Sequence, residues 1–289
     1  MKPMHRRGVL ASISAAALLI PGTVLARQMP ADDTARTSSN AQRDGRRPLH
    51  DLGGAFLDFG RDFWYALSAP VRMDRSDWLA TAGVVAAGGL LVLADEEIMR
   101  AALRNLDEPG FEQIDDVGTF LEPVGLMGKT NVYFGSGAII SYAFGWERAN
   151  RMFTEILYAE WIAGMVRGAT LHLVGRARPH NDLGAYRFAF GRGSSFPSGH
   201  SSTVFQVAAV LSHHARSTPV TILLYGLAGT VAWQRITAET HWPSDVWLGA
   251  AYGWGVAQLV IRLHEEDALR VQPAIVPSGG IGLGFRYTF

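Results

Sequence analysis

Long apolar segments alternate with short polar ones along most of this chain. Gly and Ala are frequent in the apolar segments, proline is nearly absent from their interiors, and runs of β-branched residues are short. These features are typical of helices rather than strands. The sequence therefore predicts an all-α fold, a bundle of about six helices. The expected helices cover approximately 78–94, 131–146, 153–174, 200–215, 219–234 and 244–263.

The beginning of the chain has a different pattern. Basic residues precede an apolar stretch over about 8–20, and small residues follow up to Ala26. This order is that of a secretory signal peptide, which we expect over 1–26. The apolar stretch is short for a membrane span, which favours cleavage over anchoring. Residues 27–50 are polar without an apolar period, and they are predicted to form a flexible linker.

We expect one helical domain over 51–270 and a different C-terminal segment over 271–289. Pro273 and Pro277 interrupt any helix there, and apolar residues then alternate with small or polar ones up to Phe289. A period of two residues predicts a strand. A single strand cannot form a closed barrel, so we expect a short C-terminal strand or tail whose purpose the sequence leaves open.

Composition narrows the class of protein. The chain has 26 basic and 26 acidic residues and therefore no formal net charge. It lacks the basic excess that nucleic-acid-binding proteins use, so no nucleic-acid partner is expected. There is no cysteine, which excludes disulfides, thiolate metal sites and a cysteine nucleophile. Hydrophobic residues make up 48% and charged residues 18%, a balance between those of soluble proteins and of proteins with many membrane spans.

Three clusters of polar residues stand at the ends of expected helices. The first is Gly-Arg-Ala-Arg-Pro at 175–179, and the second is Phe-Pro-Ser-Gly-His at 196–200. The third combines Arg235, His241 and Asp245. Each cluster alone is common in proteins. Their order and their placement at helix ends predict that they converge at one end of the bundle.

The first two clusters and the arginine of the third suit a phosphate group. Arg178 and Arg235 carry planar, permanently charged groups that can bind two phosphate oxygens at once. Ser198 adds a hydroxyl donor at the start of a helix. Gly199 adds a backbone N–H at the helix N-terminus, where an anion is favoured, and allows close approach of a ligand. We therefore expect these four residues to bind phosphate.

Two histidines provide reactive groups. His241 and Asp245 are four residues apart, so on a helix they share one face. Asp245 would then accept a hydrogen bond from one imidazole nitrogen and leave the other nitrogen free as a nucleophile. His200 is suited to proton transfer at neutral pH.

In this order, the clusters resemble the signature of the type 2 phosphatidic acid phosphatase and vanadium haloperoxidase superfamily. That signature reads Lys, six residues, Arg-Pro; then Pro-Ser-Gly-His; then Ser-Arg, five residues, His, three residues, Asp. The resemblance covers about residues 130–262, and the combined motif is specific. The matching positions are Arg178-Pro179, 197–200, Arg235, His241 and Asp245.

The resemblance implies a role for each residue. His241 would attack phosphorus and form a phosphohistidine, Asp245 would orient it, and His200 would protonate the leaving oxygen. The reaction would need no metal and no cofactor. The residues expected to hold the phosphoryl oxygens and stabilise their charge are Arg178, Arg235, Ser198 and Gly199.

The chain departs from the signature at two positions. Leu171 stands where the superfamily has Lys, and Gln234 stands where Ser precedes the arginine. We expect another cation to replace the lysine as a phosphate contact. Arg176 is favoured because it is near in sequence, and Arg167 and His172 are the alternatives.

The resemblance implies a metal-independent phosphatase of phosphate esters or diphosphates, with a lipid phosphate or isoprenyl diphosphate favoured. Three alternatives remain open: a soluble periplasmic acid phosphatase, a vanadate-dependent haloperoxidase, and a non-catalytic phosphate- or lipid-binding relative. The missing lysine at Leu171 and the modest length count against the haloperoxidase. The retained histidines and Asp245 count against the non-catalytic relative.

The expected location follows from the signal peptide and the apolar segments. An exported protein of the cell envelope is predicted, and the apolar segments are long for a core of this size, which favours association with the membrane. The site would face the periplasm, and a soluble periplasmic protein is the alternative. The number of true spans and the oligomeric state do not follow from the sequence.

Overall fold

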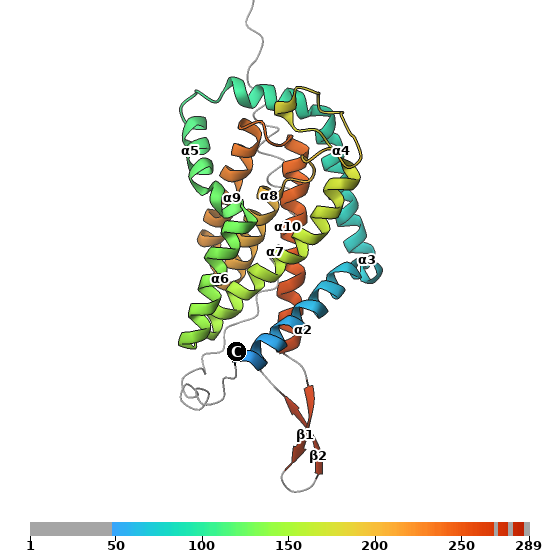
Figure 1. Cartoon of the computed structure of the whole chain (residues 1–289), viewed down its shortest axis with the longest axis vertical. Coiled ribbons are helices and arrows are strands. Elements are labelled where there is room, and N and C mark those ends of the chain that lie inside the picture. The colour runs from blue at the N-terminus through green and yellow to red at the C-terminus, as the bar shows by residue number, and fades with distance from the viewer. Residues whose placement is uncertain (1–47, 269–270, 277–279, 286–289) are drawn as a thin grey trace, which may run out of the picture. The chain divides into compact units, whose positions relative to one another are not determined.

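The computed structural model describes residues 48–268, 271–276 and 280–285, and it describes side chains within 53–265. The described part is a helical bundle with a small hairpin, so the predicted all-α fold is confirmed (Figure 1). Its helices are α2 (Pro48–Leu67), α3 (Ala69–Arg72), α4 (Arg75–Arg104), α5 (Phe111–Leu121), α6 (Met127–Phe144), α7 (Glu147–Val174), α8 (Gly199–Ala215), α9 (Thr218–Thr237) and α10 (Pro243–Ala268), with 3-10 turns η1 (Glu122–Gly125) and η2 (Pro179–Asn181).

The six helices expected from the apolar pattern correspond to α4 and to α6 through α10. Each is longer than expected, and in α4, α7 and α10 this is because polar residues at an end continue the helix. In α4, for example, Asp74 and Asp77 form a reciprocal capping box at the start, which extends the helix beyond its apolar stretch. Helix α5 was not predicted, because acidic residues interrupt its short apolar pattern.

The structure tests the sequence predictions for the two ends of the chain only in part. The predicted signal peptide and most of the predicted linker lie outside the described residues. Helix α2 begins at Pro48, inside the range predicted as linker. At the other end, β1 (Val271–Val276) pairs antiparallel with β2 (Gly280–Phe285). The predicted strand corresponds to β2, whereas Pro273 obscured β1 in the sequence.

Helix α8 lies within the core of the bundle and packs against α7, α9 and α10. Its contact with α10 is close because glycines of α10 face the α8 backbone. A Cβ atom at Gly253 would lie 2.1 Å from the carbonyl oxygen of Ser202, and one at Gly249 would lie 2.4 Å from that of Ser198. Only glycine fits at such separations. The contact brings the N-terminus of α8 beside the first turns of α10.

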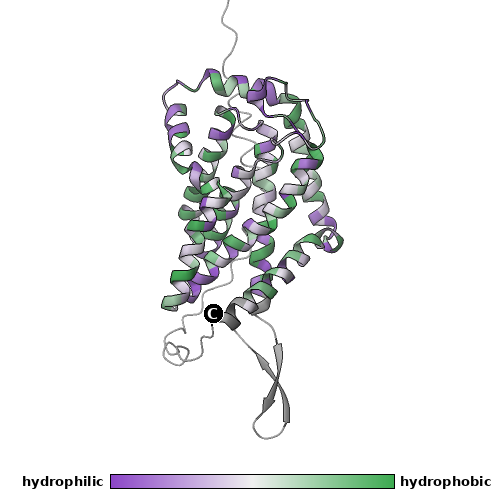
Figure 2. Ribbon diagram, viewed as in Figure 1, coloured by the Kyte–Doolittle hydropathy of each residue, from purple (hydrophilic) through white to green (hydrophobic). Residues whose placement is uncertain are grey.

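Helix α4 contrasts with this core because little of its surface is covered. It has 30 residues, or about 45 Å at 1.5 Å per residue, and only 6% of its most apolar stretch is buried. Hydrophilic residues gather where α4 ends and α5 begins (Figure 2). Among the described residues, α4 and the stretch Pro243–Glu265 of α10 are long and apolar enough to cross a membrane.

Candidate active site

The three predicted clusters meet at one end of the bundle, where α7 and α9 end and α8 and α10 begin (Figure 1). Backbone hydrogen bonds tie them together. The amide of Ser198 donates to the carbonyl of Asp245 at 3.0 Å, and the amide of His241 donates to that of Arg235 at 3.1 Å. These bonds confirm the predicted convergence of the second and third clusters.

The turn after α7 brings the first cluster to the same place. Gly175 has φ of +59° and ends α7 in the left-handed conformation. A Cβ atom there would lie 1.9 Å from the carbonyl oxygen of Ala189, so the position requires glycine. Beyond this turn, the carbonyl of Arg176 accepts a hydrogen bond from the amide of Ser195 at 3.1 Å.

His241 lies buried in the turn before α10. Its Nδ1 atom is 2.6 Å from the carbonyl oxygen of Ser195. A carbonyl oxygen only accepts hydrogen bonds, so Nδ1 carries the hydrogen and Nε2 of the neutral ring has a free lone pair. The pKa of His241 is lowered to about 3, mainly because the ring is buried and also because Arg178 is near. At neutral pH the ring is therefore uncharged and nucleophilic.

The predicted hydrogen bond between Asp245 and His241 is wrong. Asp245 instead accepts from the Ser195 hydroxyl, from Arg176 Nη1 at 2.6 Å and from the Trp242 amide at 3.1 Å. The i to i+4 argument failed because α10 begins only at Pro243, so His241 lies outside the helix. Asp245 fixes Ser195, and the carbonyl of Ser195 orients the histidine.

Arg176 does not face a phosphate pocket, contrary to the sequence prediction. Its side chain is 1% exposed, and each guanidinium nitrogen already donates a hydrogen bond within the protein. Its charge is shared between two buried carboxylates, those of Asp95 at 2.6 Å and Asp245 at 2.6 Å. Arg176 therefore links the two buried carboxylates and has no free donor for a substrate.

Asp95 is a site residue that the sequence analysis missed. Asp95 begins a run of three acidic residues at 95–97, yet it is fully buried. Its carboxylate accepts from the amide of Ser244 at 2.8 Å and from the Ser244 hydroxyl at 2.6 Å, besides Arg176. The exposed helix α4 is thereby fixed to the start of α10. A carboxylate directly after a long apolar helical stretch was the available signal.

His200 and Arg235 lie together, as predicted, and share a third partner. His200 Nε2 is 2.9 Å from Glu122 Oε1, and Arg235 Nη1 is 3.3 Å from the same oxygen. Arg235 Nη1 also lies 3.4 Å from His200 Nε2. The other side of Arg235 donates to Gln234 Oε1 from Nε at 2.7 Å. Gln234, which replaces the Ser of the signature, is thus a hydrogen-bond acceptor for the arginine.

Arg167, one of the two alternatives to Arg176 for the missing lysine, lies against the second cluster. A Cβ atom at Gly199 would lie 2.9 Å from the guanidinium carbon of Arg167, so the cation lies over the N-terminus of α8. Burial lowers the pKa of Arg178, and the positive charge of nearby Arg167 lowers it further. Two cations and the first amides of α8 therefore surround one space, an arrangement suited to an anion. The third candidate, His172, is exposed and bonds to Gly168 of its own helix.

Ser198, predicted to contact phosphate, also caps helix α8. Its side chain caps α8 by accepting from the amide and the hydroxyl of Ser201, at 3.4 Å and 3.0 Å. The residue is fully buried. Its own hydroxyl hydrogen is the donor left for a phosphate oxygen.

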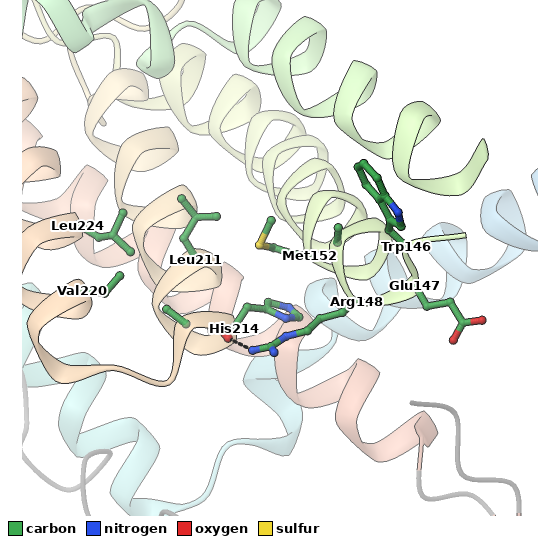
Figure 3. Close-up of a pocket in the computed structure, with 10 residues that line it drawn as sticks. Trp146, Glu147, Arg148, Met152, Leu211, His214, Val220 and Leu224 are labelled. Atoms are coloured by element: carbon green, nitrogen blue, oxygen red, sulfur yellow. Dashed lines mark hydrogen bonds between the residues drawn. The ribbon is translucent and has the colours of Figure 1, made fainter. Parts of the chain in front are cut away.

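A cavity of about 670 Å³ lies at the other end of the same helices, between the start of α7, the end of α8 and the start of α9 (Figure 3). Apolar residues such as Met152, Leu211 and Leu224 line most of it. Arg148, at its rim, donates to the carbonyl of His214. The cavity lacks converging phosphate donors. Within the described residues, no group of His, Asp and Glu side chains is arranged to hold a metal ion.

The segment that contains this site is similar to a known family of proteins. Residues 153–268, which include the three clusters, match the model of the PAP2 superfamily. The resemblance predicted from the sequence is thereby confirmed, and Glu122 and Asp95 lie outside the matched segment.

Three curated relatives are each named lipid A 1-phosphatase. The protein of Rhizobium johnstonii is 30% identical over 161 residues, which cover 45% of this chain and 64% of that protein. That of Rhizobium etli is 32% identical over 127 residues, covering 41% and 51%. That of Porphyromonas gingivalis is 35% identical over 86 residues, covering 27% and 19%. The chain thus spans less than two thirds of each relative.

Two solved structures are also similar. Aquifex aeolicus LpxE is 21% identical with a TM-score of 0.42, and the match covers 58% of this chain and 94% of that one. The transmembrane PAP2-type phosphatidylglycerolphosphate phosphatase of Bacillus subtilis is 21% identical with a TM-score of 0.47, covering 64% and 96%.

Proposed function

We propose that this protein is a phosphatase that hydrolyses a phosphorylated lipid through a phosphohistidine on His241. The observation that carries the proposal is the buried, neutral ring of His241, whose Nδ1–H is held by the carbonyl of Ser195. Its free Nε2 lies at the end of the bundle where Arg178, Arg235 and Arg167 gather. The PAP2 match and the lipid A 1-phosphatase relatives support this reading.

The first step transfers the phosphoryl group to the protein. Nε2 of His241 forms a bond to phosphorus while the bond from phosphorus to the leaving oxygen breaks, and His200 gives its proton to that oxygen. The arginines offset the charge on the phosphoryl oxygens. The ring becomes cationic, and the carbonyl of Ser195 stabilises the remaining N–H at Nδ1.

The second step releases phosphate. A water molecule attacks phosphorus, His200 takes its proton, and the bond from phosphorus to Nε2 breaks. His241 returns to its neutral state and His200 to its protonated one, so atoms and charge balance over the cycle. The chain's own residues supply every group used, and positioning accounts for much of the rate.

The proposal of a lipid substrate has its own support in the loop between η2 and α8. Backbone hydrogen bonds fix this loop to the turn after α7, for example from the amide of Ala189 to the carbonyl of Gly175 at 2.8 Å. The loop nevertheless exposes large apolar side chains, together with basic Arg187 and Arg192. Such a surface suits a bilayer with anionic headgroups. The exposed apolar residues are Leu183, Tyr186, Phe188 and Phe190.

Replacing Tyr186 and Phe190 with Ser is expected to lower turnover of a phosphorylated lipid in vesicles about tenfold. Each ring contributes about 1–2 kcal/mol of burial at a membrane surface, and the doubly substituted protein loses part of it. Turnover of soluble p-nitrophenyl phosphate should stay unchanged. Phe144→Ser is the control, because Phe144 is an exposed aromatic residue at the C-terminal end of α6 and does not belong to this loop. Equal losses on both substrates would show that the loop supports the site rather than the lipid surface.

Phosphate release by the purified full-length protein in detergent, without added metal, tests the proposed function. Lipid A, phosphatidic acid, an isoprenyl diphosphate and p-nitrophenyl phosphate are compared, beside His241→Ala. We expect release from at least one lipid and loss of more than about 1,000-fold in the variant. Preference for p-nitrophenyl phosphate would favour a soluble-type acid phosphatase. Vanadate-dependent halide oxidation without phosphate release would show a haloperoxidase, and binding without either would show a non-catalytic relative.

A further inference from the structure

Glu122 is the one carboxylate among the described residues that contacts both His200 and Arg235. It lies in η1, outside the segment that matches the superfamily and outside its signature. We propose that Glu122 is a positioning residue that keeps the proton on Nε2 of His200 and holds Arg235 until a phosphate group arrives. This inference rests on the proposed function, because it assigns a partner to the proton donor of that reaction.

The position of the carboxylate is fixed by packing of η1 and α5. A Cβ atom at Gly125 would lie 2.8 Å from Cδ2 of His200, so the backbone of η1 lies directly against the imidazole ring. A Cβ atom at Gly118 would lie 2.3 Å from the carbonyl oxygen of Thr230, so α5 packs closely on α9. The short turn between these two contacts leaves Glu122 little freedom to face elsewhere.

The chemistry of the contact sets the state of His200. An ionised carboxylate only accepts hydrogen bonds, so the hydrogen between Glu122 and His200 belongs to Nε2. Burial lowers the pKa of His200, the charges of Arg235 and Arg178 lower it further, and Glu122 opposes them. The net direction is downward, and Glu122 is the group that favours the protonated ring against burial and the two arginines. A general acid needs that proton at working pH.

Arg235 links this pair to the substrate. In the structure its guanidinium is held between Gln234 and Glu122. A phosphate dianion offers stronger acceptors than Gln234 and attracts the arginine. Glu122 then interacts with His200 alone. As the bond from phosphorus to the leaving oxygen breaks, that oxygen replaces Glu122 Oε1 as the acceptor of the Nε2 hydrogen and takes the proton.

Glu122→Gln tests the proposal through its dependence on the leaving group. The amide keeps the shape and an acceptor oxygen but removes the charge that retains the proton. For an alkyl phosphate ester, whose leaving oxygen needs a proton, we expect kcat to fall about 100-fold. For p-nitrophenyl phosphate, whose leaving group departs without a proton, the loss should be below about tenfold. The alkaline limb of the pH–rate profile should move to lower pH, and Glu122→Asp should restore part of the alkyl-ester rate.

Two further variants separate the possible outcomes. Asp115→Asn is the matched control, since Asp115 binds Thr237 across the same α5–α9 contact without reaching His200, and its ratio between substrates should equal that of the wild type. His200→Gln should show the same leaving-group dependence, with little further loss in the double variant. Equal losses on both substrates in Glu122→Gln would overturn the inference and leave the residue a structural one. A wild type without turnover would instead overturn the proposed function.

Discussion

Replacing Arg176 with Met is expected to destabilise the protein by about 3–5 kcal/mol and to abolish phosphatase activity. The substitution keeps an apolar chain of similar length but leaves Asp95 and Asp245 buried without their shared cation. Removing one partner of a buried ion pair has this cost because an uncompensated charge remains. Thermal unfolding in detergent and phosphate release measure the two effects. The control is Arg187→Met, since Arg187 is an exposed arginine of the neighbouring loop; it should change neither stability nor phosphate release from soluble p-nitrophenyl phosphate.

A double variant shows whether charge is the cause. Adding Asp95→Asn to Arg176→Met removes one of the two uncompensated carboxylates, so it should recover part of the lost stability. If Arg176→Met instead kept wild-type stability and raised only KM, the arginine would be a phosphate ligand, as the sequence suggested. That result would contradict the buried network seen in the structure.

Replacing Arg167 with Ala is expected to lower kcat/KM about 100-fold with little change in stability. The guanidinium lies over Gly199 and makes no hydrogen bond with the described residues, so its loss removes a charge from the site without breaking a hydrogen bond to the described part of the protein. Loss of one group that stabilises the developing charge costs about 2.7–4 kcal/mol, and a neighbouring arginine compensates in part. Steady-state kinetics on a soluble phosphate ester measure the change.

A substitution at Leu171 tests whether Arg167 takes the role of the missing lysine. Adding Leu171→Lys to Arg167→Ala restores the lysine of the superfamily signature one helical turn away. We expect this double variant to regain at least about tenfold of the lost kcat/KM. Arg192→Ala, which removes an exposed cation of the nearby loop, is the control and should leave kcat/KM unchanged. Unchanged kinetics in Arg167→Ala would show that the site works without a third arginine.

The sequence predicted the class of fold and the convergence of the clusters because both depend on local pattern. Apolar periodicity fixes the helices, and residues at helix ends meet once the helices pack. Arg178, His200, Arg235 and His241 are accordingly found together at one end of the bundle. The residues that touch them could not be derived in the same way, because that depends on where each helix begins. His241 lies before the start of α10, and its hydrogen-bond partner is therefore Ser195 rather than Asp245.

The remaining errors concern partners far apart in the chain. Arg176 and Arg167 are both near Leu171 in sequence, and the turn at Gly175 decides which of them faces the site. Glu122 and Asp95 reach the site from η1 and α4, and no motif links them to the later clusters. Their burial and their contacts follow from tertiary packing alone.

The central claim is that His241 is the nucleophile, and trapping its phosphorylated form tests this most directly. The protein is mixed with ³²P-labelled substrate, quenched in alkaline denaturant and digested, and the labelled peptide is identified by mass spectrometry. The account predicts label on His241 that is stable in base and labile in acid, that forms no more slowly than turnover, and that is absent from His241→Ala. Phosphate release without label on His241, or label on His200 instead, would contradict it.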